Sequence, residues 1–83
     1  MHTADFIFQY PSAENAAIVE QSVRVEAGDI TGDRTRATVD RDGTVLTVTV
    51  DATDLTALRA GVNTWLALVD VAESTAGTQT VAR

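Results

Sequence analysis

The chain has 83 residues, which is enough for one domain with a core of modest size. It contains no cysteine, which excludes disulfides and zinc–thiolate sites. Its only histidine is His2, at the N-terminal end, so histidine-based catalysis and metal binding are not expected. No apolar run approaches the ~20 residues that span a bilayer, and residues 1–12 lack the basic segment of a signal peptide. We therefore expect a cytoplasmic protein without a membrane anchor.

The charge pattern is unusual because lysine is absent from the sequence. Twelve acidic and six basic residues give a formal net charge of −6, and all six basic residues are arginine. Such a composition is typical of proteins adapted to high internal salt, as in halophilic archaea, because concentrated salt screens the repulsion between carboxylates. Chance in a GC-rich genome is the alternative explanation.

The first predicted element is a strand over residues 5–10. Its residues alternate, and one face carries the aromatic side chains of Phe6, Phe8 and Tyr10, which we expect to face the helices. Pro11 ends the strand, because proline has no backbone N–H to donate to a ladder.

A helix is predicted over residues 12–27. Ser12 is a suitable N-cap, and Glu14 places a negative charge at the positive end of the helix dipole. Gly28 is expected to take the left-handed conformation just after the helix.

Residues 35–41 and 44–51 are predicted to form a hairpin. The turn is expected over residues 40–43, which end in an Asp-Gly pair that favours tight connections. Apolar residues alternate with threonine along both arms, so one face should pack on helices and the threonine-rich face should meet water.

The longest predicted element is a helix over residues 51–73, capped by Asp51 or Thr53. Its apolar surface is wider than one stripe. The main stripe consists of Leu55, Leu58, Val62, Trp65, Val69 and Ala72. A neighbouring run of mostly small residues consists of Ala57, Ala60, Gly61, Thr64, Leu68 and Val71. A surface helix needs only one stripe, so the second one predicts a partner.

Several residues of this helix have two interpretations. Arg59 either extends its side chain over an apolar rim or anchors an interface by pairing with a carboxylate across it. Trp65 belongs either to the core or to an interface. Gly61 costs a helix ~1 kcal/mol relative to alanine, which indicates that another backbone or helix approaches closely there. The predicted interface residues are Leu55, Leu58, Arg59, Val62, Asn63, Trp65, Leu66 and Leu68.

The order of elements predicts an α+β fold, β-α-β-β-α, with a three-stranded antiparallel sheet in the order 1-3-2 and two helices on one face. The first strand is then an open edge, which proteins usually pair or cover. Residues 1–75 are expected to form the single domain, and residues 76–83 are expected to be a disordered tail.

The side chains that could take part in catalysis or bind a metal do not form a recognisable active site. We predict no catalytic, cofactor-binding or metal-binding residues, because the available carboxylate pairs fall at turns and caps where aspartate is common. Nucleic-acid binding has one set of candidates, a weak phosphate track formed by Arg34, Arg36 and Arg41. The alternative is that these arginines are solvated charges that balance nearby aspartates.

The helices and the hairpin resemble a known family. The most specific part is the run A-x-D-x-x-x-L-R-A-x-x-N-[ST], which here consists of Ala52, Asp54, Leu58, Arg59, Ala60, Asn63 and Thr64. Together with the first helix and the end of the hairpin, this run is similar to the Pcc-type small subunit of the archaeal and eukaryotic KEOPS (EKC) complex, whose human relatives are the L antigen family. The resemblance covers about residues 4–73.

This resemblance implies a subunit without catalytic activity or a cofactor of its own. It implies a homodimer that binds the catalytic threonylcarbamoyltransferase subunit through its helices. The complex adds threonylcarbamoyl to the adenosine next to the anticodon of tRNA, and the small subunit is expected to support tRNA engagement. The acidic, lysine-free composition departs from many relatives, which weighs against direct phosphate binding. The alternative hypothesis is a free-standing RNA-binding module of KH-like shape.

Overall fold

The computed structural model describes the backbone of residues 1–30 and 35–78, and the side chains of these residues apart from 26–30. The elements are β1 (His2–Gln9), α1 (Ala13–Ile30), β2 (Thr35–Asp42), β3 (Val45–Ala52) and α2 (Leu55–Ala76). Their order is the predicted β-α-β-β-α. Within the described residues no helix combines the length and the apolar character needed to cross a membrane.

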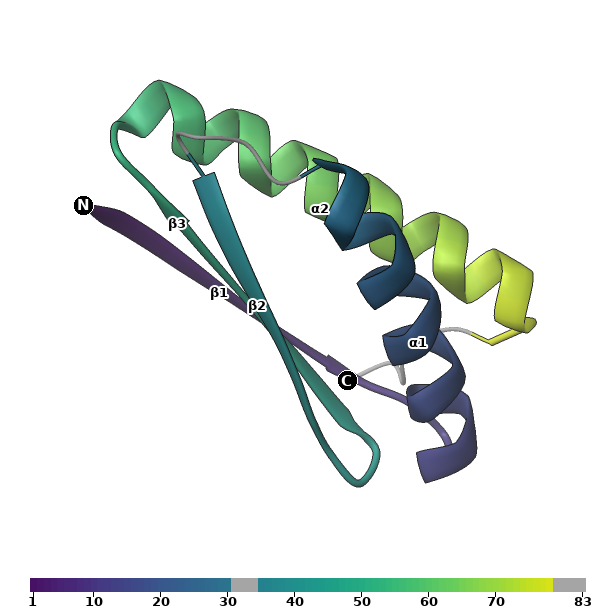
Figure 1. Cartoon of the computed structure of the whole chain (residues 1–83). Helices are drawn as coiled ribbons and strands as arrows, with labels where there is room; N and C mark the ends of the chain where they lie inside the picture. The colour runs from purple at the N-terminus through teal and green to yellow at the C-terminus, as the bar shows by residue number, and fades with distance from the viewer. Residues whose placement is uncertain (31–34, 79–83) are drawn as a thin grey trace.

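The three strands form one antiparallel sheet in the order β1-β3-β2, and both helices lie on one face of it (Figure 1). This confirms the predicted fold class and strand order. Insertion of β3 between the two strands that α1 connects makes every neighbouring pair antiparallel. β1 and β2 are the edges, so each has one row of backbone groups without a strand partner in the sheet.

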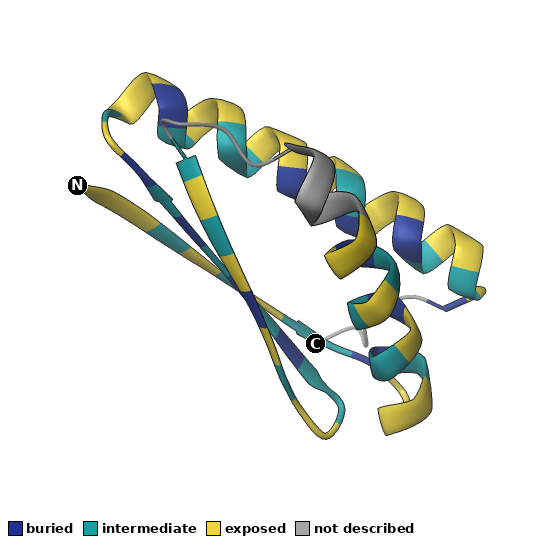
Figure 2. Ribbon diagram, in the orientation of Figure 1, coloured by how far each residue is buried: buried dark blue, intermediate teal, exposed yellow. Residues whose placement is uncertain are grey.

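The core lies between the sheet and the helices, where Figure 2 shows the buried positions. It depends on the strict alternation of β3, whose buried residues are Leu46, Val48, Val50 and Ala52. Val48 lies opposite Phe6 on one side and Val39 on the other. Phe6 and Phe8 pack against this core, and Tyr10 is buried in it, so the aromatic side chains face the helices as predicted.

The other face of the sheet is rich in threonine, as predicted, and it also exposes Ile7 of β1. Two hydrogen bonds join β1 and β3 across it. The Thr3 hydroxyl donates to Asp51 Oδ1 over 2.7 Å, and the Thr49 hydroxyl donates to Asp5 Oδ1 over 2.8 Å. Asp51 is therefore a strand residue with a partner in the sheet.

The N-cap of α2 differs from the prediction. Asp54 is the cap, and its side chain accepts a hydrogen bond from the backbone N–H of Ala57 over 2.8 Å. The predicted caps, Asp51 and Thr53, are wrong, because β3 continues through Asp51 and the helix begins only at Leu55. Residues 51–54 contain three side chains that can accept a capping bond, and their types alone do not rank them.

The end of α1 also differs from the prediction. The helix continues through Gly28 to Ile30, so Gly28 is a helical residue and not a left-handed cap. Glycine inside a helix costs only ~1 kcal/mol relative to alanine, which does not force the helix to end there.

α2 ends three residues later than predicted, at Ala76 instead of Glu73. Gly77 supplies the left-handed conformation, with φ of 71°, and its N–H donates to the last turn. Thr78 is buried against the fold. The predicted irregular tail therefore does not begin after Glu73. Residues 79–83 lie outside the described residues, and the division into residues 1–75 and 76–83 stays a prediction.

The hairpin loop lies one residue later than predicted. Asp42 pairs with Val45, so only Gly43 and Thr44 connect the strands, and the rest of the predicted turn belongs to β2. Gly43 has φ of 63°, which favours glycine at the first position of a two-residue loop. The Thr44 carbonyl accepts a bond from the backbone N–H of Tyr10, which joins the turn to the end of β1.

Gly61 allows α2 to lie close to the sheet. A Cβ atom at this position would stand 3.1 Å from Val50 Cγ1 and 3.5 Å from Thr35 Cγ2. The close approach predicted from the sequence is therefore present, but the neighbour is the chain's own sheet and not another helix. Gly61 sets the separation between α2 and β3.

A partly buried hydrogen bond ties the C-terminal part of α2 to the end of β1. The Tyr10 hydroxyl donates to Glu73 Oε2 over 2.7 Å, and Tyr10 is only 1% exposed. Burial, followed by the hydrogen bond and the charge of Glu73, raises the pKa of Tyr10 well above its ordinary value of about 10.

This pKa shift predicts the alkaline stability of the protein. The sequence has no lysine, no cysteine and one tyrosine, so between about pH 10 and about pH 12 Tyr10 is the only side chain that titrates. The unfolded chain then loses a proton that the folded chain keeps. The free energy of unfolding should fall by about 1.4 kcal/mol per pH unit above about pH 10. Urea denaturation across this range measures the slope.

Tyr10→Phe is the control, since it removes the titrating group and the hydrogen bond. The variant should be less stable at neutral pH by about 1–3 kcal/mol and should lose the alkaline slope. An equal slope in both proteins would show that Tyr10 is not responsible.

Candidate protein-interaction surfaces

α2 presents three sides, and the predicted interface residues are distributed over all of them. The side that faces the sheet carries Trp65, which is 6% exposed, and Leu58, which is partly buried against the core. Both are core residues in this chain, although the sequence did not separate core from interface for Trp65. Buried Val69 and Ala72 extend the same side toward the C-terminus.

A second side of α2 borders the β1 edge of the sheet. Leu55 and Leu66 are exposed here by 47% and 41%, and Val62 between them is half-buried. Arg59 and Asn63 are exposed at the rim of this side. A shallow hollow of about 160 Å³ joins it to β1, and the lining consists of Phe8, Leu66, Val69, Asp70 and Glu73. Five of the eight predicted interface residues therefore lie on one side of the helix.

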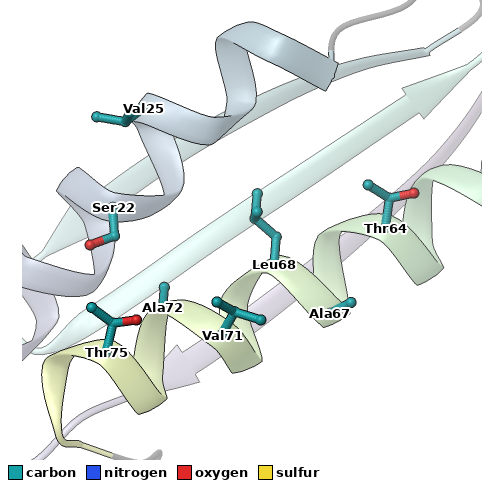
Figure 3. A pocket seen from close by; sticks show the side chains of 8 residues that line it. All are labelled: Ser22, Val25, Thr64, Ala67, Leu68, Val71, Ala72 and Thr75. Atoms are coloured by element: carbon teal, nitrogen blue, oxygen red, sulfur yellow. The ribbon is translucent and has the colours of Figure 1, made fainter.

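The third side of α2 faces α1, and an apolar groove of about 660 Å³ lies between the two helices (Figure 3). Its lining consists of Ser22 and Val25 of α1 and of Thr64, Ala67, Leu68, Val71, Ala72 and Thr75 of α2. Val25 and Val71 are 72% and 62% exposed, which is unusual for valine. Among the described residues of the lining none is charged, and their polar side chains are all hydroxyls. We call this surface the α1–α2 groove.

The groove follows from the small residues of both helices. Leu68 is the largest side chain among the described residues of the lining, and threonine, alanine and serine leave the space beside it unfilled. Leu68 was predicted as an interface residue from the sequence, whereas Ser22, Val25, Ala67 and Thr75 were not. Val25 could have been identified from the sequence, because an apolar residue outside the buried side of α1 indicates a contact surface. Its neighbours on α2 become known only from the fold.

The candidate RNA-contact residues do not form one described track. Arg34 lies outside the described residues. Arg36 and Arg41 are both on β2, but five positions separate them, so their side chains lie on opposite faces of the sheet. Arg36 is exposed on the polar face, beside Asp51 of β3.

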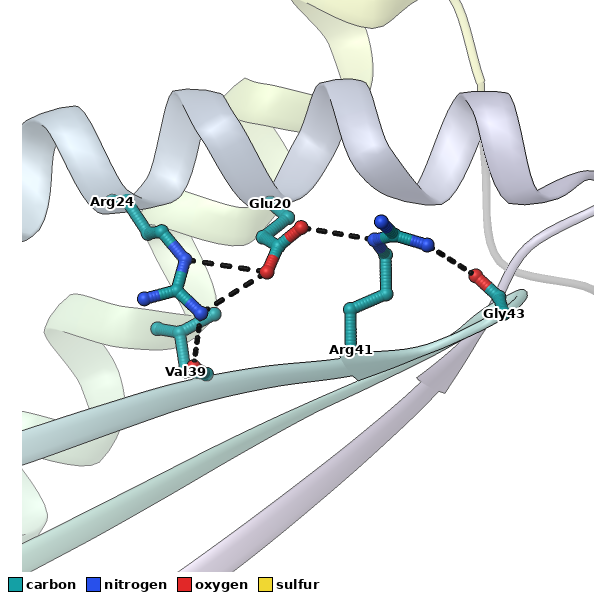
Figure 4. A network of polar contacts seen from close by, with 5 residues as sticks. All are labelled: Glu20, Arg24, Val39, Arg41 and Gly43. Atoms are coloured by element: carbon teal, nitrogen blue, oxygen red, sulfur yellow. Dashed lines mark hydrogen bonds and ion pairs between the residues drawn. The ribbon is translucent and has the colours of Figure 1, made fainter.

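Arg41 lies on the helical face, where it joins a network centred on Glu20 of α1 (Figure 4). Its Nε donates to Glu20 Oε1 over 2.9 Å, and its Nη1 donates to the Gly43 carbonyl over 3.1 Å. Arg24 donates to the second Glu20 oxygen and to the Val39 carbonyl. The hydrogen bond from Arg41, aided by Arg24, lowers the pKa of Glu20 against the opposing effect of burial.

This network has a structural consequence for the sheet edges. Arg24 covers part of the outer edge of β2 by bonding the Val39 carbonyl, and Arg41 fixes the end of β2 to α1. Within residues 1–30 and 35–78, no side chain forms a comparable bond to the outer edge of β1. β1 is therefore the edge that remains available for pairing.

Polar side chains of the described structure are not gathered into a cluster that suits a metal ion. Among residues 1–30 and 35–78, no group of three or more histidine, cysteine, aspartate or glutamate side chains could hold a metal ion. Buried side-chain nitrogen and oxygen atoms in the same residues all have hydrogen-bond partners. What the described surface offers is apolar contact area and an unpaired strand edge.

Comparisons with known proteins agree with this architecture. The family model described as "Transcription factor Pcc1" matches residues 3–77. A chain in the crystal structure of a binary complex of Gon7 and Pcc1 has the same fold, with a TM-score of 0.78 and 16% sequence identity. The superposition covers 89% of this chain and 90% of that chain. No curated protein matches by sequence.

The different contacts of the two arginines of β2 predict different effects of their substitution on the free energy of unfolding. Arg41→Gln removes the hydrogen bonds to Glu20 and to the Gly43 carbonyl, and it should lower the free energy of unfolding by about 0.5–1.5 kcal/mol. Arg36→Gln, on the exposed face of the same strand, should change it by less than about 0.5 kcal/mol. Urea denaturation of both variants measures the difference. Equal effects would contradict a structural role that is specific to Arg41.

Proposed function

We propose that this chain, which belongs to the Pcc1 family, is a dimer-forming scaffold subunit of the KEOPS complex that makes threonylcarbamoyladenosine in tRNA. Pcc1 is a non-catalytic KEOPS subunit. The chemistry then belongs to other subunits, and this chain contributes binding surfaces. The observation that carries the proposal is that α2 presents an apolar surface on each flank of its core-facing side. Because the proposed complex acts on tRNA, we expect the protein in the cytoplasm.

The β1 side supports self-association. The open edge of β1 can extend the sheet by pairing with a second strand, since edge strands present unpaired N–H and C=O groups. Leu66 lines the hollow beside Phe8 of β1, and Leu55 lies on the same side of α2 by helical spacing, so both would lose water contact in a dimer that covers this side. The chain with the same fold was crystallised in a binary complex of Gon7 and Pcc1, so that protein has a partner chain.

The α1–α2 groove supports binding of the catalytic threonylcarbamoyltransferase subunit. Sites for small molecules usually place several polar groups around an apolar pocket. The described lining of this groove is instead uncharged, with hydroxyl groups from Ser22, Thr64 and Thr75. Such a surface suits the apolar face of a helix, which can lie between α1 and α2 as a third helix. We assign the groove to the transferase subunit for this reason.

The described structure favours an indirect role for this chain in tRNA engagement. Arg24 and Arg41 are occupied by Glu20, and Phe6, Phe8 and Tyr10 pack toward the helices, so they offer no stacking surface. We propose that the chain supports tRNA binding by holding the complex together. A free-standing RNA-binding module would instead bind tRNA tightly without partners, and titration of tRNA against the isolated chain distinguishes the two.

A charge placed in the groove should separate its role from that of the β1 side. Val71→Asp puts a carboxylate among uncharged groove residues, and it should weaken binding to the transferase subunit by about ten-fold or more. Val71 is largely exposed, so the fold and the dimer should persist. Calorimetry with the purified transferase subunit measures binding, and light scattering measures the dimer.

Ser74→Asp is the matched control for this experiment. It adds the same charge at an exposed position of α2 outside the groove lining, and it should leave transferase binding unchanged. If Val71→Asp bound as tightly as Ser74→Asp, the groove would not be the transferase site.

A further inference from the structure

One flank of α2 carries both charge signs around an apolar centre. This flank stripe consists of Leu55, Arg59, Val62, Leu66 and Asp70. Spacings of four, three, four and four residues keep these side chains on one side of a helix. Arg59 and Asp70 are exposed, and within the described residues neither has an ion-pair partner.

The stripe is self-complementary about its own midpoint. The apolar residues Val62 and Leu66 are centred on position 64, and the charged residues Arg59 and Asp70 are centred between positions 64 and 65. A two-fold axis perpendicular to the helix near position 64 places Val62 of one copy opposite Leu66 of the other, and Leu66 opposite Val62. It also places each Arg59 opposite Asp70 of the partner subunit, about 8 Å along the helix from the centre.

The position of α2 over the sheet agrees with such an axis. α2 contacts β3 and β1 more than β2, and its C-terminal half reaches β1, where Leu66, Asp70 and Glu73 line a hollow with Phe8. If two β1 edges pair about a two-fold axis, neighbouring strands are ~4.8 Å apart, and the two α2 helices are separated by roughly 10 Å. Helices that pack through their side chains are separated by about 8–10 Å. The stripes would therefore meet.

We propose that the flank stripe is the helical half of the homodimer interface, and that two symmetric Arg59–Asp70 ion pairs fix its register and favour a second copy of this chain. This inference rests on the dimer in the proposed function and adds the residues that specify it. The charge arrangement distinguishes the two flanks of α2. The described lining of the groove carries no charge, whereas the stripe carries one residue of each sign at matching distances from its midpoint.

Charge reversal tests this pairing directly. In the Arg59→Glu homodimer each new carboxylate lies opposite Asp70 of the partner subunit, and in the Asp70→Arg homodimer each new guanidinium lies opposite the partner's Arg59. Each variant alone therefore has two repulsive contacts, and its homodimer should dissociate at least about ten-fold more readily than the wild type. Both positions are exposed, so the fold should persist, and circular dichroism checks this.

Mixing the two variants should restore association. In the mixed dimer both contacts join opposite charges. One contact keeps the original Arg59–Asp70 pair. The other joins the two substituted residues, a carboxylate at position 59 and a guanidinium at position 70. Equimolar Arg59→Glu and Asp70→Arg should therefore form a heterodimer in preference to either homodimer. The double variant, with both changes on one chain, should form a homodimer again. Native mass spectrometry of differently tagged chains, at one fixed salt concentration, measures the three species.

The outcomes separate this inference from the proposed function. A dimeric wild type with dimeric single variants, or a mixture without preference for the heterodimer, would overturn the ion pair and leave the proposed dimer standing. A monomeric wild type would overturn both. Loss in each single variant with recovery in the mixture would support the interface as described.

Discussion

The close contact between α2 and the central strand is the constraint on which the rest of this structure depends. Gly61 has no Cβ, and the place that a Cβ would occupy is only 3.1 Å from Val50 Cγ1. This contact fixes which side of α2 faces the sheet, because Trp65, Val69 and Ala72 then lie over the buried residues of β3. The rotation of the helix in turn decides what remains outside. One flank of α2 borders the open β1 edge, and the other lines the groove with α1.

The fold was predictable because each element has a clear period. Alternation along β3 and the aromatic face of β1 predicted strands, and the order of elements then allowed few sheet topologies. Element ends were less predictable for local reasons. Several consecutive residues near Asp54 can cap a helix, and glycine at position 28 weakens a helix without ending it. Such choices depend on hydrogen bonds that neighbours in space offer.

The interaction surfaces were only partly predictable. The sequence showed that α2 has more apolar surface than one stripe, but a helix that is apolar over most of its circumference does not show which side is buried. Leu58 and Leu66 look alike in sequence, yet the first packs on the core and the second is exposed. The groove also needs Ser22 and Val25, which belong to the other helix and are separated in the chain from the rest of the lining by the whole β2–β3 hairpin. Only the fold brings these residues together.

The two flanks of α2 are expected to bind different partners at the same time. The mass of the complex between the wild-type chain and the transferase subunit tests this expectation most directly, and native mass spectrometry can measure it. Two copies of each protein in one particle, with the chain's dimer at its centre, is the predicted result. A particle with one copy of each, in which the transferase subunit has displaced the second copy of the chain, would contradict it.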